Sequence, residues 1–218
     1  MNLEVITTKD GSSTIENKDL DESYHSKNGA INESKHIFIQ NGLLSCNKNP
    51  INILEIGFGT GLNALLTQVT CDKRKIKNIY HTIDNNPIKS NKYNALNFCK
   101  ELKIDNTDFL KMHNGAWDKE LTISDNFTLL KIHNDLQSFN NKINYDIIYF
   151  DAFSPEKQPE LWKENIFRNL FNSLNKQGIL VTYCAKGKIK RRLKKVGFKI
   201  NSLPGPTGKR EITQAKKI

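Results

Sequence analysis

Three glycines at alternate positions, Gly57, Gly59 and Gly61, follow directly after the apolar run 51–56. Such a loop can adopt backbone angles that are closed to other residues, and it lets a ligand approach the main chain. Glu55 stands two residues before the first glycine, at the end of the expected strand, where an acid must face either water or a ligand. An acid at this place favours a cationic ligand over a pyrophosphate, which it would repel.

A strand, a glycine loop and a helix are expected over residues 51–66, as at the start of a nucleotide-binding α/β sheet. The pattern E-x-G-x-G-x-G resembles the first motif of class I S-adenosylmethionine (SAM) methyltransferases, whose cofactor is a zwitterion without phosphate. It differs from the G-x-G-x-x-G of dinucleotide folds and lacks the G-K-[ST] of a P-loop. The resemblance implies that Phe58 and Asn63 bind the cofactor together with Glu55 and the glycines. The structural alternative is a glycine turn in an ordinary α/β protein.

Two further acids follow the next expected strands. Asp84 ends the strand expected at 77–84, where an acid of a doubly wound sheet accepts hydrogen bonds from the ribose hydroxyls of an adenosine. NAD and SAM folds share this spacing, and a strand-end turn is the structural alternative. Asp135 lies at the end of the strand expected at 127–136, and the resemblance to SAM folds implies that it contacts the adenine amine.

Asp151 ends the apolar strand expected from Tyr145 and is followed by Phe153, Ser154 and Pro155. We expect this strand to lie beside the first one, across the topological switch point where ligands of such sheets bind. Asp151 should therefore point into the crevice, next to the sulfonium of SAM. A capped turn is the structural alternative.

The N-terminal part is expected to precede the sheet. Residues 3–20 predict a small hairpin with a turn at Asp10-Gly11. The hydrogen-bonding side chains of Tyr24, His25 and Glu33 indicate either a lid that faces the ligand or a linker followed by a surface helix.

The pattern as a whole predicts a class I SAM-methyltransferase fold, a Rossmann-like α/β fold with a seven-stranded, mostly parallel sheet and helices on both faces. Residues 1–45 form the hairpin and lid segment, and residues 46–218 form the core. Besides the strands named above, the prediction has a helix at 88–102 opened by Pro87, an insertion at 112–126, an amphipathic helix at 161–174, a turn at 175–178, a strand at 178–184, a basic helix at 186–195, and last strands at 198–203 and 210–215.

The charge is strongly basic: 33 Lys and Arg outnumber 23 Asp and Glu among 218 residues, for a formal net charge of +10. This excess favours polyanionic partners such as nucleic acid, although a solvated lysine surface gives the same count. The four cysteines form no C-x-x-C, so no metal site is expected. Without a signal-peptide pattern or an apolar run of about 18 residues, we expect a soluble cytoplasmic protein that does not bind membranes.

Four stretches together resemble the MnmC-type tRNA methyltransferases. They are Y-H-S-x-x-G-A-x-x-E-S at 24–34, E-I-G-F-G-T-G-L-N at 55–63, D-A-F-S-P-x-x-x-P-E-L-W at 151–162 and G-K-R-E at 208–211. The resemblance implies methylation by SAM of the 5-aminomethyl group on the wobble (2-thio)uridine of tRNA, at the anticodon stem-loop. Two-domain members carry a fused FAD oxidase. This chain resembles the stand-alone type without an FAD domain, for which a separate enzyme could supply the amine.

The resemblance also implies residue roles. Asp151 orients and deprotonates the amine or holds the SAM ammonium, and Phe153 covers the target base. Asp84 departs from the family pattern, in which Glu is common. The residues expected to bind the tRNA substrate are Tyr24, His25, Glu33, Phe153, Ser154, Lys186, Arg191, Arg192, Lys209 and Arg210. Alternatives that remain open are a SAM methyltransferase of a small amine or of protein, and a nucleic-acid-binding Rossmann module without activity. A nicotinamide dehydrogenase is disfavoured by the glycine spacing.

Overall fold

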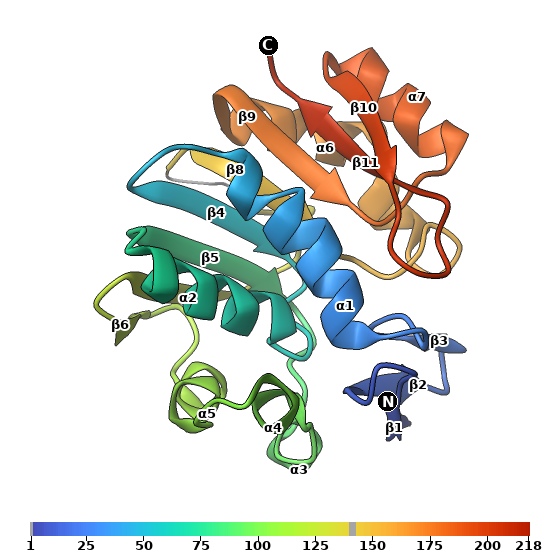
Figure 1. The fold of residues 1–218 in the computed structure, drawn as a ribbon. Helices are drawn as coiled ribbons and strands as arrows, with labels where there is room; N and C mark the ends of the chain where they lie inside the picture. Colours follow the sequence, from blue (N-terminus) through green and yellow to red (C-terminus); the bar gives the residue numbers. More distant parts are fainter. Residues whose placement is uncertain (1, 140–142) are drawn as a thin grey trace.

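The computed structural model describes residues 2–139 and 143–218. Its main sheet has eight strands in the order β10-β11-β9-β8-β4-β5-β7-β6 (Figure 1). The five central strands run parallel: β9 (Leu174–Thr182), β8 (Tyr145–Phe150), β4 (Ile51–Ile56), β5 (Asn78–Asp84) and β7 (Phe127–His133). The predicted α/β class with a mostly parallel sheet is confirmed, and β4 lies beside β8 as predicted.

The sheet has one strand more than predicted. β6 (Glu120–Ser124) pairs antiparallel with β7 inside the segment that was predicted as an insertion. It is an edge strand in which only Ile123 is buried, so its short polar alternation gave a weak strand signal. At the other end, β10 (Lys199–Pro204) and β11 (Glu211–Lys216) confirm the two predicted last strands; they form an antiparallel hairpin, and β11 pairs with β9.

Two predicted elements differ. The helix expected at 88–102 is two short helices, α3 (Ser90–Tyr93) and α4 (Phe98–Leu102), and Pro87 opens neither. Asn97 interrupts the helix because its side chain bonds the N-terminal hairpin instead, accepting from Ser13 N at 2.7 Å and donating to Gly11 O at 2.9 Å. The turn expected at 175–178 is an irregular part of β9, where the pairing register with β8 shifts.

The remaining helices cover the two faces of the sheet (Figure 1). One face carries α1 (Ala30–Ser34), which continues as a π-helix (Lys35–Gln40), together with α2 (Leu62–Arg74) and α5 (Thr107–Asn114). The other carries α6 (Glu164–Ser173) and α7 (Gly187–Val196). Short 3-10 turns occur at Leu43–Ser45 and Pro159–Trp162.

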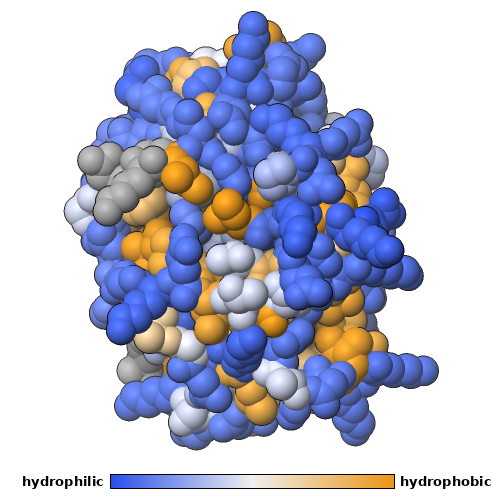
Figure 2. Space-filling model, turned by 90° about the vertical axis from the view of Figure 1, so that its left-hand side faces the viewer, coloured by the Kyte–Doolittle hydropathy of each residue, from blue (hydrophilic) through white to orange (hydrophobic). Residues whose placement is uncertain are grey.

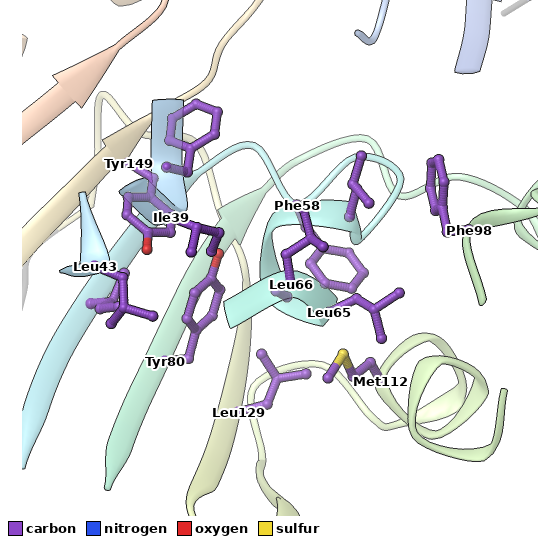
Figure 3. Close-up of a cluster of buried hydrophobic side chains, with 14 of the residues drawn as sticks. Ile39, Leu43, Phe58, Leu65, Leu66, Tyr80, Phe98, Met112, Leu129 and Tyr149 are labelled. Atoms are coloured by element: carbon purple, nitrogen blue, oxygen red, sulfur yellow. The ribbon is translucent and has the colours of Figure 1, made fainter. Parts of the chain in front are cut away.

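Alternation along the strands divides the core into two layers. Ile51 and Ile53 of β4 pack under α1 and α2, whereas Leu54 and Ile56 pack against α6 and α7. Figure 3 shows part of the first layer, in which Tyr80 and Tyr149 lie near Leu43 and Leu129 meets Met112. Figure 2 shows one face of the surface, where hydrophilic residues predominate and hydrophobic ones form small patches between them.

The N-terminal strands form a small sheet of their own, as the predicted hairpin plus one short strand. β1 (Leu3–Thr7), β2 (Ser13–Asn17) and β3 (Glu22–Ser23) pair antiparallel in that order. In the part of the chain that the structure describes, no helix is both long enough and apolar enough to cross a bilayer.

Candidate functional site

A cavity of about 310 Å³ lies at the carboxyl ends of β4, β5, β7 and β8. The loops that follow these four strands form its floor, and the segment after β3 forms one wall. Twelve of the residues singled out from the sequence line it, coming from six separate parts of the chain: Tyr24, His25, Glu33, Gly57, Phe58, Gly59, Asn63, Asp84, Asp135, Asp151, Phe153 and Lys209. The structure thus brings most of the predicted site into one space.

The glycine loop has the backbone conformation that its sequence requires. Gly57, Gly59 and Gly61 have φ values of 92°, 48° and 74°, in the left-handed region. A Cβ at Gly59 would lie 3.0 Å from a ring carbon of Tyr24, so the loop also fits closely against the N-terminal segment. The backbone is thereby exposed to a ligand in the cavity at Gly57 and Gly59, while Gly61 packs against His113 outside it.

Asp84 closes one end of the cavity. Its carboxylate accepts the backbone N–H of Gly59 at 3.0 Å and that of Asn86 at 2.8 Å, which fixes it beside the glycine loop. Burial raises the pKa of Asp84, although these hydrogen bonds oppose the rise. Asp135 lies at the same end, where it accepts the N–H of Gln137 at 2.9 Å. Two acids with remaining acceptor capacity therefore face a region that could hold the hydroxyls and amine of an adenosine.

Asp151 lies at the centre of the cavity wall. Asn63 Nδ2, from the first turn of α2, donates to Asp151 Oδ2 at 2.8 Å. Burial and the neighbouring charge of Glu33 raise the pKa of Asp151 well above its usual range, whereas the Asn63 hydrogen bond and the charge of Lys209 lower it. In its ionised form, a carboxylate with a raised pKa is a stronger base than an ordinary one.

Glu55 does not reach the cavity. It is completely buried beneath the glycine loop, on the same side of β4 as Ile53, and burial raises its pKa well above the usual range. The side chains of Thr82, Asn63 and Tyr80 lie beside the carboxyl and lower its pKa, but burial outweighs them. This geometry places Glu55 as a support of the loop and not as a direct contact of a ligand cation.

The N-terminal segment is placed as a lid. Tyr24 meets Phe153 edge to face with ring centroids 5.0 Å apart, and His25 Nε2 shares a hydrogen bond of 2.6 Å with Thr60 Oγ1 of the glycine loop. Burial lowers the pKa of His25 to about 4, so its ring is neutral near pH 7. Glu33 accepts the N–H of Ser26 at 2.7 Å, which joins the start of the lid to α1.

Lys209 comes to the cavity from the loop between β10 and β11. Its ammonium lies 3.3 Å from Glu33 Oε1 and 4.6 Å from the ring centroid of Tyr183. Lys209 was predicted to bind the tRNA substrate, and the structure places its ammonium next to Glu33 in the cavity that Asp151 also lines.

In addition to Glu55 and Gly61, five residues that were predicted to bind the substrate lie outside the cavity. Ser154 donates to Glu22 at 2.9 Å, and Arg192 donates to the carbonyl of Trp162 at 2.7 Å. Lys186 pairs with Glu156, and Arg191 and Arg210 are exposed on the surface. Ser154 and Arg192 therefore support neighbouring segments, while the exposed cations remain available to a polyanion.

Sequence reasoning missed Tyr183, which lines the cavity after β9 and donates its hydroxyl to Ala152 O at 2.9 Å. Its position after a central parallel strand was the available signal. Gln158, which accepts the N–H of Phe153 at 3.2 Å, and Asn134 were also missed. Gln158 occupies an unspecified position of the motif at 151–162, and Asn134 stands in a loop without a motif.

The arrangement can bind a nucleoside at one end and a second reactant at the other. Asp84, Asp135 and the backbone of the glycine loop line one part of the cavity, and Phe153, Tyr183 and Lys209 line another. An acid that accepts a proton stands between them, so the cavity can bring two reactants together and take up a proton.

Comparisons with known proteins identify related chains. A family model described as S-adenosyl-L-methionine-dependent methyltransferase matches residues 90–218. The bifunctional protein MnmC of tRNA 5-methylaminomethyl-2-thiouridine biosynthesis from Marinomonas sp. is 27% identical over 89% of this chain and 31% of its own length. The corresponding protein of Leptospira interrogans is 29% identical over 88% of this chain and 32% of its own. The chain thus spans about a third of the length of these curated relatives.

Among solved structures, MNMC2 from Aquifex aeolicus superimposes with a TM-score of 0.78 at 25% identity, covering 98% of this chain and 69% of that one. SAM-bound CalS10, an amino pentose methyltransferase from Micromonospora echinaspora, has a TM-score of 0.51 at 9% identity, which supports the fold alone. The resemblance to MnmC-type enzymes that the sequence motifs indicated is confirmed.

Proposed function

Because the chain belongs to the S-adenosyl-L-methionine-dependent methyltransferases, we propose that it methylates the 5-aminomethyl group of a wobble (2-thio)uridine in tRNA. The product is the 5-methylaminomethyl nucleoside named in its relatives of the MnmC type. The observation that carries this proposal is the single cavity in which a nucleoside site, Asp151 and the aromatic pair Tyr24 and Phe153 meet.

The residues present fit SAM at the acidic end of the cavity. Only glycines leave the loop open there, since a Cβ at Gly57 would lie 3.3 Å from the carbonyl of Asp151. Asp84 and Asp135 offer acceptors for the ribose hydroxyls and the adenine amine. When bound, SAM supplies a methyl group on a positively charged sulfur. The buried acids near the loop favour that charge over a phosphate.

At the other end, the chain positions the amine and receives its proton. The amine nitrogen forms a bond to the methyl carbon while the carbon–sulfur bond breaks, and the sulfur leaves as a thioether. Asp151 Oδ1 or Oδ2 accepts the proton that the amine nitrogen loses, and Asn63 holds the carboxylate in place. Most of the rate enhancement comes from holding the two reactants in line.

The base is held by stacking. Tyr24 and Phe153 stand edge to face in the lining of the cavity, and bases of RNA loops are commonly bound on such rings. A wobble base is already in a loop, so turning it into the cavity costs less than extruding a base from a duplex. The basic surface binds the phosphates of the anticodon stem-loop.

Transfer of labelled methyl from SAM to tRNA that lacks this modification tests the proposal, with nucleoside analysis of the product. Labelled methylaminomethyluridine is expected. SAM binding by calorimetry without labelled tRNA would overturn the substrate and turn the search to small amines and proteins. Absence of SAM binding would exclude a methyltransferase and favour a nucleic-acid-binding module without activity.

A further inference from the structure

Lys209 is a cation among the described residues that line the cavity, and the proposed reaction gives it no role. Its ammonium faces Glu33 at 3.3 Å and lies over the ring of Tyr183 at 4.6 Å, and it lines the same cavity as Asp151. Its side chain is only 31% exposed, which is low for a lysine on a loop. A residue that served only to bind phosphates would point outward.

The loop that carries Lys209 is held against the lid. His36 Nε2 lies 2.8 Å from the carbonyl of Pro204, at the start of the loop. Gly208 has a φ of +87°, and a Cβ there would lie 2.2 Å from the side chain of Asn28. Only glycine permits this contact, and it places the next residue at the cavity. The position of the ammonium is therefore built into the fold.

The charges around this ammonium come from several elements. Glu33 of α1 is 9% exposed, and Asp151 follows β8. Tyr183 and Cys184 follow β9, and Tyr24 and Glu22 of the N-terminal segment also line the cavity. The last four groups are neutral or, in the case of Glu22, hydrogen-bonded to Ser154. Lys209 is thus the cation that balances two acids, Glu33 and Asp151.

We propose that Lys209 is a positioning residue of methyl transfer, whose ammonium favours the ionised form of Asp151 and disfavours entry of the substrate amine in its protonated form. This inference rests on the proposed function for the identity of the amine. A protonated amine has no lone pair for the methyl carbon, and a protonated Asp151 cannot accept a proton. One fixed cation near both groups favours the ionised carboxylate and the neutral amine through the same Coulomb interaction.

The charges that act on Asp151 agree with this role. Glu33 raises the pKa of Asp151 and Lys209 lowers it, so removal of the lysine leaves two acids that repel one another in a buried site. The cationic substrate amine would then replace Lys209 between the two carboxylates. Such an amine would bind well and react poorly.

The first measurement is the titration of the Asp151 carboxyl in protein labelled with [13C]aspartate, with Asp151→Asn for assignment. We expect Lys209→Met to raise the pKa of Asp151 by about one pH unit and Lys209→Arg to restore it. Lys73→Met, which removes an exposed cation at the far end of α2, is the matched control and should leave the titration unchanged. Lys209→Gln repeats the test if the Met variant does not fold.

The second measurement is the pH profile of kcat/KM for labelled methyl transfer. Its acid limb should move to higher pH in Lys209→Met by a similar amount, with an unchanged Kd for SAM. An unchanged Asp151 titration overturns the inference, and a loss of tRNA affinity that depends on salt, with no change in either profile, identifies Lys209 as a phosphate contact. If wild-type protein does not methylate tRNA, the proposed function fails while the carboxyl titration still decides the role of Lys209.

Discussion

Asp151 is the residue on which the chemistry depends most directly, since it faces the cavity from the end of β8 and is held by Asn63. We expect Asp151→Asn to lower kcat by about 10²-fold or more, because the amide cannot accept the proton of the amine. Labelled methyl transfer under saturating SAM measures the effect. Asp125→Asn, an exposed acid in the turn between β6 and β7, is the matched control. Wild-type turnover by Asp151→Asn would remove this residue from the mechanism.

Glu55 is a single residue that makes the stability of the fold depend on pH. Burial raises its pKa well above the usual 4.5, so the folded protein keeps a proton that the unfolded chain releases. The free energy of unfolding contributed by Glu55 therefore falls as the pH rises from about 4.5 towards the folded pKa. His25 and His113, whose pKa values burial lowers to about 4, act in the opposite direction, because stability is lost as the pH falls below about 6.5.

We expect Glu55→Gln to remove the alkaline part of this dependence. The variant should resemble the parent near pH 5 and be more stable than it near pH 9. Denaturant unfolding across this range measures the difference, and Glu120→Gln, an exposed edge-strand acid, is the control. A variant that is destabilised equally at both pH values would show that the carboxyl has a hydrogen-bonding role instead.

At the scale of elements, the glycine loop between β4 and α2 joins the lid to the cavity floor. Gly59 has a φ of +48°, and a Cβ there would lie 3.0 Å from Tyr24. We expect Gly59→Ala to lower stability by about 1–2 kcal/mol through its left-handed backbone and to weaken SAM binding by displacing the lid. Thermal unfolding and calorimetry measure the two effects.

Gly187→Ala is the matched control for this loop. Gly187 begins α7, and a Cβ there meets only the end of the Arg191 side chain at 3.3 Å. Because alanine favours a helix, this variant should be as stable as the parent or more so, with SAM affinity unchanged. Equal loss of SAM affinity in both variants would mean that the Gly59 result reports general damage.

The short helices and the edge strand are harder to infer from the sequence than the central parallel strands. The parallel strands are apolar on both faces, so their sequences predict them directly. Asn97 lies in a segment with helical composition, yet its side chain bonds Ser13 and Gly11, which are more than 80 positions away in the chain. A local pattern cannot contain that contact. β6 was missed because its single buried residue gives little periodicity.

At the scale of the whole molecule, the net charge of +10 raises the question of which surface binds the tRNA phosphates. α7 follows β9, whose carboxyl end borders the cavity, and its exposed cations Lys188 and Arg191 lie one turn apart on one face. We expect Lys188→Glu with Arg191→Glu to weaken tRNA binding about 10-fold or more and to leave SAM affinity unchanged, because phosphate contacts are lost and like charges are added.

A salt titration of tRNA binding measures this effect, and the slope should become shallower in the α7 variant. Lys73→Glu with Arg74→Glu makes the same change in charge at the far end of α2 and is the control. If the control weakens binding as much as the α7 variant, the basic surface acts through total charge and not through a defined face.

The α/β class, the central strands and the acids at their ends could be predicted from the sequence alone, because hydrophobic runs and glycine spacing are local properties. The tertiary structure decided which of those side chains meet. Glu55 and Gly57 are two positions apart, yet the alternation of β4 buries the first and the loop opens the second. Lys209 and Glu33 are far apart in the chain and meet at 3.3 Å only because β11 returns beside β9 and α1 crosses the sheet. The protonation of Asp151 depends on such neighbours, and only the folded chain brings them together.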